Sequence, residues 1–493
     1  MSDLYDPNQS RLRVAHRHLS ENDRLYWISL VAAPIALVVA LTTGTLSILW
    51  HTAAPLPPPA VPVPSPAPSA PTVNLAELRD RATNDTAALD DLRTRANAGN
   101  AEAEFYLGTL YDPTMPGIRF AKDGPAAAQW YERAADQSYG MAENNLGFFY
   151  QTGVGKPKDE AQAASWYRKA ADQGVGLAQV NLGLLYETGR GVVKDEAEAA
   201  RWYRKAADLG EAGGAYYLGR LYESGRGVAS DLLEAARRYR TAADAGLAVA
   251  QADLGRLYEF GRGVPKDVSE AAGWYQKAAE QNNRLAEGQL GRMYAIGEGV
   301  PKDLGRSLAL FRRAAAEGDP SAVYNLAYSL DNGFGAPRNP IAAYIWYSIA
   351  TRWGNPDKQS QAAAQRDQLA RGASPDEIAA AQRAAANWRP GSHGRIGVAP
   401  QDLTPAEAQA IGSPQTKGVV VTRVEDGSPA QRAGLAAQDV VTAIDGEPIA
   451  NAAAFRELIW LDVPGQTVGL SVEKGRQRGS LQNIRVQLDQ APP

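Results

Sequence analysis

Residues 178–207 read AQVNLGLLYETGRGVVKDEAEAARWYRKAA and hold one complete copy of a unit that recurs along the chain. Its aromatic pair, Trp202-Tyr203, returns at intervals of 36 residues. A fixed period of this size is typical of repeat arrays, in which each unit buries its apolar face against its neighbours. The pattern therefore predicts a solenoid of stacked units. The equivalent pairs stand at 130–131, 166–167, 238–239, 274–275, 310–311 and 346–347.

Each unit is predicted to contain two helices. Small and apolar residues keep helical spacing across 178–186, so this segment is expected to form the first helix. Gly189 and Gly191 then favour a helix stop and a tight turn, because glycine reaches positive φ without steric cost. Asp195 follows as the N-cap of the second helix, which carries the aromatic pair. The same capping position holds Asp123, Asp159, Asp231, Asp267, Asp303 and Asn339.

The motifs of residues 178–207 are Ala-x-x-x-Leu-Gly-x-x-Tyr, Gly-x-Gly-Val, Asp and Trp-Tyr-x-Lys-Ala-Ala, and they closely resemble Sel1-like repeats, relatives of the tetratricopeptide repeats. The resemblance covers residues 91–354 and implies a right-handed α/α superhelix that acts as a protein-interaction scaffold. A helical stretch at 74–98 and a capping box at 374–377 predict helical caps, so the predicted solenoid spans 74–390. The repeats depart from the pattern at Arg238, Leu310 and Ala327.

A different pattern begins near Gly391. Short runs rich in valine and bounded by turn residues, at 418–424, 439–445 and 467–472, predict β-strands. The sequence VEDGSPA at 424–430, with AGL at 433–435 and IDG at 444–446, closely resembles a PDZ domain of the type found in bacterial high-temperature-requirement proteases. The resemblance covers residues 391–490 and implies an α+β domain that binds peptides.

The resemblance also implies where a peptide binds. In such domains a loop, here 395–398, presents backbone amides to a terminal carboxylate, and the strand beyond it accepts the peptide as a further strand. A helix over 451–461 would form the other wall of the groove. The alternative is that the apolar members of this set are core residues. The predicted peptide-binding residues are Arg395, Ile396, Gly397, Val398, Phe455, Leu458 and Ile459.

A second candidate surface is a row of polar residues along the first helices of the repeats. Amides and acids stand directly before the Leu-Gly pairs, and arginines follow three residues later on the same helix face. Such a row can grip a peptide backbone or a carboxylate. The alternative is a solvated helix face. The row consists of Asn145, Asn181, Asp253, Gln289 and Asn325, with Arg220, Arg256 and Arg292.

The N-terminal part predicts a membrane anchor. Residues 26–50 form an uncharged apolar stretch of 25 residues, long enough to span a bilayer as a helix. Four arginines precede the stretch, and no lysine or arginine follows it before Arg79, so residues 1–25 are expected in the cytoplasm. A proline-rich linker at 51–73 would carry the rest, a periplasmic body, away from the inner membrane. A cleaved signal peptide is the alternative.

Composition argues against several function classes. The net charge of −4 and the dispersed basic residues do not indicate nucleic-acid binding, and the absence of cysteine excludes thiol chemistry. Only His51 and His393 follow the apolar stretch, so neither a Ser-His-Asp triad nor a metal site is expected, and His393 is interpreted as a solvated linker residue. No cofactor or small-molecule substrate is predicted.

One column of carboxylates invites a catalytic interpretation. Glu187, Glu223 and Glu259 recur at the same place in successive repeats, and glycoside hydrolysis needs two carboxylates. The structural alternative is surface pairing at i,i+3, of Arg220 with Glu223 and of Arg256 with Glu259.

The sequence therefore predicts a non-enzymatic, membrane-anchored scaffold that binds other proteins. The alternatives are a regulatory subunit of a separate envelope protease or cell-wall enzyme, and a glycan-active enzyme.

Overall fold

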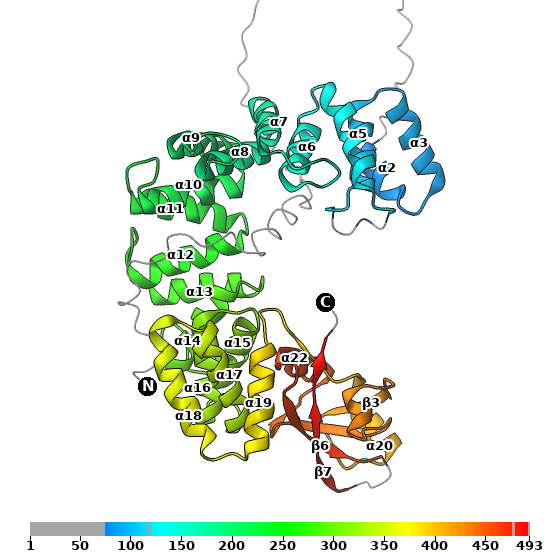
Figure 1. Ribbon diagram of the computed structural model, residues 1–493, viewed down its shortest axis with the longest axis vertical. Coiled ribbons are helices and arrows are strands. Elements are labelled where there is room, and N and C mark those ends of the chain that lie inside the picture. The colour runs from blue at the N-terminus through cyan, green and yellow to red at the C-terminus, as the bar shows by residue number, and fades with distance from the viewer. Residues whose placement is uncertain (1–73, 116–117, 119, 476–478, 492–493) are drawn as a thin grey trace, which may run out of the picture. The chain divides into compact units, whose positions relative to one another are not determined.

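The computed structural model describes residues 74–115, 118, 120–475 and 479–491 (Figure 1). This part of the chain forms two compact units, of which the first ends at Gly214 and the second begins at Ala215. The first unit is entirely helical in its described residues, and the second contains further helices followed by a domain rich in β-strands.

The helical part consists of helix pairs, as the repeat pattern predicts. In each repeat the first helix carries the position of the Leu-Gly pair and the second helix carries the position of the aromatic pair. In the unit at 178–207 these are α8 and α9. The helices are α2 (Leu75–Arg81), α3 (Thr86–Asn97), α4 (Ala101–Tyr111), α5 (Gly124–Asp136), α6 (Gly140–Thr152), α7 (Glu160–Asp172), α8 (Gly176–Thr188), α9 (Glu196–Asp208), α10 (Ala212–Ser224), α11 (Leu232–Asp244), α12 (Ala248–Phe260), α13 (Val268–Ala279), α14 (Arg284–Ile296), α15 (Leu304–Ala316), α16 (Pro320–Asn332) and α17 (Pro340–Trp353).

The predicted capping signals are confirmed. The Asp195 carboxylate accepts hydrogen bonds from the amides of Ala197 and Glu198, at 3.0 and 2.9 Å, which satisfies amides at the start of α9 that have no partner within the helix. The other aspartates of the column, and Asn339, cap their helices in the same way. Gly191 has a φ of +67°, and a Cβ there would lie 1.9 Å from the carbonyl oxygen of Glu160 in the preceding repeat. Only glycine permits that approach.

Tyrosine and glycine make the contact between the two helices of a repeat. Tyr203 is fully buried, and a Cβ added at Gly183 would lie 2.6 Å from its ring. The equivalent tyrosines, Tyr131, Tyr167, Tyr239 and Tyr275, are buried in the same manner. Small residues such as Gly183 therefore allow the two helices to approach closely, and the aromatic rings fill the space between them.

The two ends of the helical array differ in part from the prediction. The segment 74–98 forms two helices, α2 and α3, because Asp85 caps a new helix instead of continuing the first. At the other end the capping box of Ser374 and Glu377 is confirmed and opens α19 (Pro375–Asn387). Between α17 and α19 lie a short 3-10 helix, η1 (Pro356–Lys358), and α18 (Gln359–Ala370), which the repeat pattern did not predict.

The C-terminal domain is built on an antiparallel sheet with strand order β2-β3-β4-β6-β7, and β5 also pairs with β4. Strand β2 is therefore an edge strand. Helix α22 packs beside it, and the core between sheet and helices contains Val421, Leu470, Phe455 and Ile459. The elements are β1 (Gly394–Arg395), β2 (Val398–Asp402), α20 (Pro405–Ile411), β3 (Val419–Val424), α21 (Pro429–Arg432), β4 (Val440–Ile444), β5 (Glu447–Pro448), α22 (Ala452–Leu461), β6 (Thr467–Glu473), β7 (Leu481–Gln487) and β8 (Asp489–Gln490).

The localisation expected from the sequence, a single-pass inner-membrane protein with a periplasmic body, is contradicted. In the described ranges, 74–115, 118, 120–475 and 479–491, no helix is both long and apolar enough to cross a membrane. The longest helix there, α17, has 14 residues, and at about 1.5 Å per residue it falls short of the roughly 30 Å hydrocarbon core. The predicted tail, span and linker (1–73) lie outside the described residues.

Candidate functional site

A groove of about 520 Å³ lies between the edge strand β2 and helix α22. Among the strands that the structure describes, β2 pairs with β3 alone, and Val398 and Pro400 on its free side line this groove. Of the predicted peptide-binding residues, the structure brings six together here and leaves Leu458 out. The groove is lined by Arg395, Ile396, Gly397, Val398, Phe455 and Ile459, and in addition by Gly394, Pro400, Glu425, Arg456, Glu457 and Trp460, which the sequence did not single out.

The loop at one end of the groove directs backbone N–H groups toward it. The carbonyl oxygen of Ile396 accepts from the amide of Ala430, and that of Gly397 accepts from the amide of Glu425, both at 3.0 Å. In a trans peptide the C=O and N–H point in opposite directions. The amides of Gly397 and Val398 therefore point away from those partners, in an arrangement suited to binding an anion.

Gly397 is required by the geometry of this loop. Its φ is +76°, a left-handed conformation that side-chain-bearing residues rarely adopt. A Cβ at this position would also lie 2.3 Å from the Cβ of Ser428. Any other residue would thus displace the loop.

The outer edge of β2 offers few hydrogen-bonding groups. The amide of Glu425 donates to the carbonyl of Gly397, and the amide of Leu403 donates to the carbonyl of Gly418, on either side of a bulge at Ala399/Pro400. Because backbone groups alternate in direction along a strand, those of Val398 and Pro400 point away from β3. Pro400 has no N–H, so its carbonyl is its only contribution to an added strand. The edge is therefore suited to a short ladder.

Both interpretations of the apolar residues hold at once. Ile396, Phe455 and Ile459 are 5%, 2% and 4% exposed and belong to the domain core, yet they also line the groove. The groove rim carries Trp460, which is 46% exposed. Its ring stacks on that of His393 with 4.1 Å between centroids. The interpretation of His393 as a solvated linker residue is therefore wrong, because its side chain is only 16% exposed.

Two arginines bring positive charge to the groove, one in an ion pair and the other bonded to a backbone carbonyl. Arg395 forms an ion pair with Glu425, which also lines the groove. Arg456 is exposed, and its guanidinium donates a hydrogen bond of 3.2 Å to the carbonyl oxygen of Pro400. In the described parts of the chain, Arg456 has no ion-pair partner.

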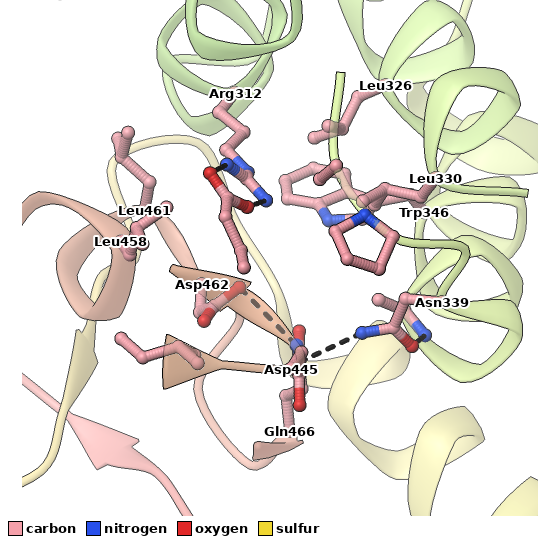
Figure 2. A pocket seen from close by; sticks show the side chains of 15 residues that line it. Arg312, Leu326, Leu330, Asn339, Trp346, Asp445, Leu458, Leu461, Asp462 and Gln466 are labelled. Atoms are coloured by element: carbon pink, nitrogen blue, oxygen red, sulfur yellow. Dashed lines mark hydrogen bonds and ion pairs between the residues drawn. The ribbon is translucent and has the colours of Figure 1, made fainter. Parts of the chain in front are cut away.

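Leu458 faces the helical array instead of the groove. It lines a small cavity of about 30 Å³ between the β-rich domain and helices α15 to α17, together with Arg312 and Trp346 from the repeats (Figure 2). The expectation that Leu458 contributes to the peptide groove is therefore not supported by its position. Helix α22 has two buried faces, and sequence spacing alone does not distinguish them.

Polar contacts hold this junction between the β-rich domain and the repeats. Arg312 of α15 makes two hydrogen bonds to the Glu447 carboxylate, at 2.9 and 2.5 Å. The side chain of Asn339, which caps α17, donates to Asp445 at 2.9 Å, as Figure 2 shows. The two parts thus meet through charge-assisted bonds as well as apolar packing.

Two further residues of the β-rich domain lie at the junction, the buried Val463 and the partly buried Asp462. Val463 is fully buried in the same apolar cluster as Phe311, Trp346 and Trp388 of the helical part. Beside it, burial raises the pKa of Asp462 to about 8, and the nearby Asp445 carboxylate adds to the rise. The β-rich domain and the last repeats therefore share one core, and the raised pKa of the partly buried Asp462 beside it favours the neutral carboxyl group near pH 7.

Most side chains of the polar row predicted along the first helices are buried or bonded within the helical array. In the first unit, Asn145 and Asn181 are 8% and 7% exposed. Asn144 links them, donating to Asn145 at 3.2 Å and accepting from Asn181 at 2.9 Å. Asn325, in the second unit, is also buried. A fully solvated helix face is therefore not what these residues form.

The arginines of the row pair across repeats. Arg256 bonds to Glu223 at 3.0 and 2.8 Å and to Asp253 at 3.0 Å, and Arg292 pairs with Glu259. Each Arg–Glu pair joins residues 33 positions apart, so the predicted i,i+3 pairing of Arg256 with Glu259 is replaced by a bond between neighbouring repeats. Arg220 lies over the rings of Tyr216 and Tyr217.

The carboxylate column has the same structural use. Tyr239 donates to Glu223 at 3.0 Å, and Tyr275 donates to Glu259 at 2.8 Å. Burial alone would raise the pKa of Glu223, but the hydrogen bonds and charge of Arg256 lower it. A carboxylate kept ionised and saturated with partners is poorly suited to act as a general acid.

Comparison with known proteins agrees with this arrangement. The Sel1 repeat family matches residues 101–139, 140–175, 176–211, 212–247, 248–283, 285–319 and 320–354, and the PDZ domain family matches residues 394–488. The chain is similar to a probable periplasmic serine endoprotease DegP-like of Bartonella henselae, with 36% identity over 99 residues, 20% of this chain and 19% of that protein. It is also similar to a putative serine protease HhoA of Synechocystis, with 32% identity over 97 residues, 18% of this chain and 25% of that protein.

Among solved structures, a Sel1 repeat protein from Oxalobacter formigenes is similar, with 36% identity and a TM-score of 0.43, covering 46% of this chain and 91% of that one. The chain spans only about a fifth to a quarter of the length of the two proteases. The predicted helical repeats and C-terminal α+β domain are confirmed as Sel1 repeats and a PDZ domain.

Proposed function

This chain belongs to the Sel1 repeat family and ends in a PDZ domain, and from that premise we propose that it is a non-catalytic scaffold whose PDZ groove captures the C-terminus of another protein. Sel1 repeats and PDZ domains indicate roles in protein–protein interaction. The finer proposal is that a free C-terminal peptide adds to β2 while its carboxylate binds at the loop.

The observation that carries this proposal is the coincidence of three features in one groove. The amides of Gly397 and Val398 are directed away from the partners of the adjoining carbonyls. The edge of β2 lies open beside them, and Phe455 and Ile459 supply an apolar floor. An anion site, a strand edge and an apolar pocket together match a peptide that ends in an apolar residue with a free carboxylate.

The scaffold role follows from how the PDZ domain is attached. Val463 and the Arg312–Glu447 pair fix the domain to the last repeats, so a captured partner would be held next to the solenoid. The solenoid is proposed to bind a second protein, because stacked repeats provide an extended surface. No catalytic residue is assigned.

The test is retention of peptides by the full chain. A random peptide pool with free C-termini and the same pool with amidated C-termini are passed over immobilised protein. We expect the protein to retain the free-carboxylate pool only. Equal retention of both pools would contradict carboxylate capture.

A further inference from the structure

The groove has a defined length. At one end lies the loop of Gly397, and at the other the Asp402 carboxylate accepts a hydrogen bond of 2.6 Å from the amide of Ala452, the first residue of α22. This contact joins β2 to α22 beyond Pro400. A peptide strand inside the groove can therefore run alongside Val398 and Pro400 only.

Antiparallel pairing fixes which ligand residues these are. If the last residue of a peptide lies opposite Val398, the third residue from its end lies opposite Pro400, because partner positions advance one by one in opposite directions. Side chains two apart point to the same face of a strand. The third residue from the end therefore directs its side chain toward α22, like the last residue, which enters the apolar floor.

Arg456 occupies that position on α22. Its guanidinium already donates a hydrogen bond to the Pro400 carbonyl. The same carbonyl is the acceptor for the amide of the ligand residue opposite Pro400. A ligand must displace this bond, and an isolated exposed cation gains most from a carboxylate in exchange. The adjacent Glu457 is not placed to compensate it, since residues at i,i+1 on a helix do not face each other.

We propose that the groove selects free C-termini with an acidic side chain at the third residue from the end, and that Arg456 is the residue that determines this specificity. The inference rests on the proposed function and adds the ligand class to it. In the unoccupied groove Arg456 holds the Pro400 carbonyl, and in the complex it binds the ligand carboxylate while the ligand amide takes its place at Pro400.

The test uses two synthetic peptides with free carboxylates, Gly-Ser-Gly-Ser-Gly-Glu-Ala-Val and the same peptide with Gln in place of Glu. Their affinities for the full chain are measured by fluorescence anisotropy. The Glu peptide is expected to bind roughly fivefold more tightly, as suits one partly exposed charge-assisted bond. In Arg456→Gln the preference should disappear.

The matched control is Arg485→Gln, an exposed arginine on β7, at the opposite edge of the sheet. It should keep the preference. Equal affinity of the two peptides for the unaltered chain, or a preference that survives Arg456→Gln, would overturn the inference while leaving peptide capture intact. Failure of both free-carboxylate peptides to bind would overturn the proposed function, and the inference with it.

Discussion

Arg312 and Glu447, 135 positions apart in the sequence, are joined by two hydrogen bonds that hold the PDZ domain on the last Sel1 repeats. The two side chains are 16% and 24% exposed, so the pair is largely withdrawn from water. Its geometry is that of a bidentate guanidinium–carboxylate pair, which is stronger and more directional than a single hydrogen bond. The PDZ domain is therefore an integral part of the end of the array.

Removing one partner of this pair should destabilise the junction. Arg312→Met leaves the Glu447 carboxylate without its partner, and we expect a loss of about 1 to 3 kcal/mol in the free energy of unfolding, measured by urea denaturation. Arg306→Met, on the same helix, breaks a far more exposed pair with Asp303 and should cost about 0.5 kcal/mol or less. Equal losses in the two variants would show that the junction pair does not stabilise the fold.

Asp462 should make stability depend on pH. Its pKa is raised to about 8 in the folded protein, against about 3.9 in an unfolded chain. Between these values the folded state binds more protons than the unfolded state, so stability falls as pH rises from about 4 to about 8.

The measurement for Asp462 is the difference in unfolding free energy between the natural chain and Asp462→Asn. The natural chain should lose stability relative to the variant by at most about 1.4 kcal/mol per pH unit across that window. Burial also raises the pKa of Glu287, to about 7. Glu287 is present in both chains, so its contribution cancels in the difference. Parallel stability curves would contradict a neutral Asp462 at the junction.

Gly397→Ala should abolish peptide binding. The added methyl group collides with Ser428 and forces the loop out of place. Gly412→Ala is the matched control, because Gly412 also has a positive φ, of +71°, but a Cβ there meets nothing within 4 Å. Both variants should lose about 1 kcal/mol of stability from backbone strain, whereas only Gly397→Ala should lose binding in anisotropy measurements. Unchanged peptide affinity in Gly397→Ala would show that the loop at 395–398 is not part of the binding site.

The pair of Arg256 and Glu223 should act on stability and leave peptide binding unchanged. A double-mutant cycle with Arg256→Met and Glu223→Gln, followed by urea denaturation, is expected to give a coupling energy of about 1 to 2 kcal/mol, because the pair is partly buried and bridges two repeats. Additive losses would indicate no direct coupling. Altered peptide affinity in either variant would indicate that this part of the array takes part in ligand binding.

Local features of the fold could be predicted from the sequence. The 36-residue period, the Asp caps and the Gly-x-Gly turns are repeated many times, so each copy supports the same interpretation of Asp195 and Gly191. Helix α18 occurs once and has no such support, which is why it was not predicted. Strand β7 was missed because most of its side chains are polar and exposed, so it lacks the valine-rich pattern of β3 and β6.

The site could be predicted only where a motif marks it. Gly397 and its neighbours stand in a recognisable loop, whereas Arg456 and Trp460 are ordinary residues of an amphipathic helix. Their role depends on which element lies across from α22. In the same way, Leu458 fits the groove by spacing alone, and only the docking of α22 on α15 directs it to the junction. Contacts between distant segments set these roles, and no local pattern encodes them.

Hydrogen–deuterium exchange of the full chain, with and without the peptide Gly-Ser-Gly-Ser-Gly-Glu-Ala-Val, shows whether a free C-terminus binds along β2. Strand addition should slow exchange in residues 394–403 and 452–461, because the ligand covers the edge of β2 and packs on α22. Exchange at 140–188, in the repeats, should not change. Protection confined to the repeats, with 394–403 unaffected, would contradict peptide capture by the PDZ groove.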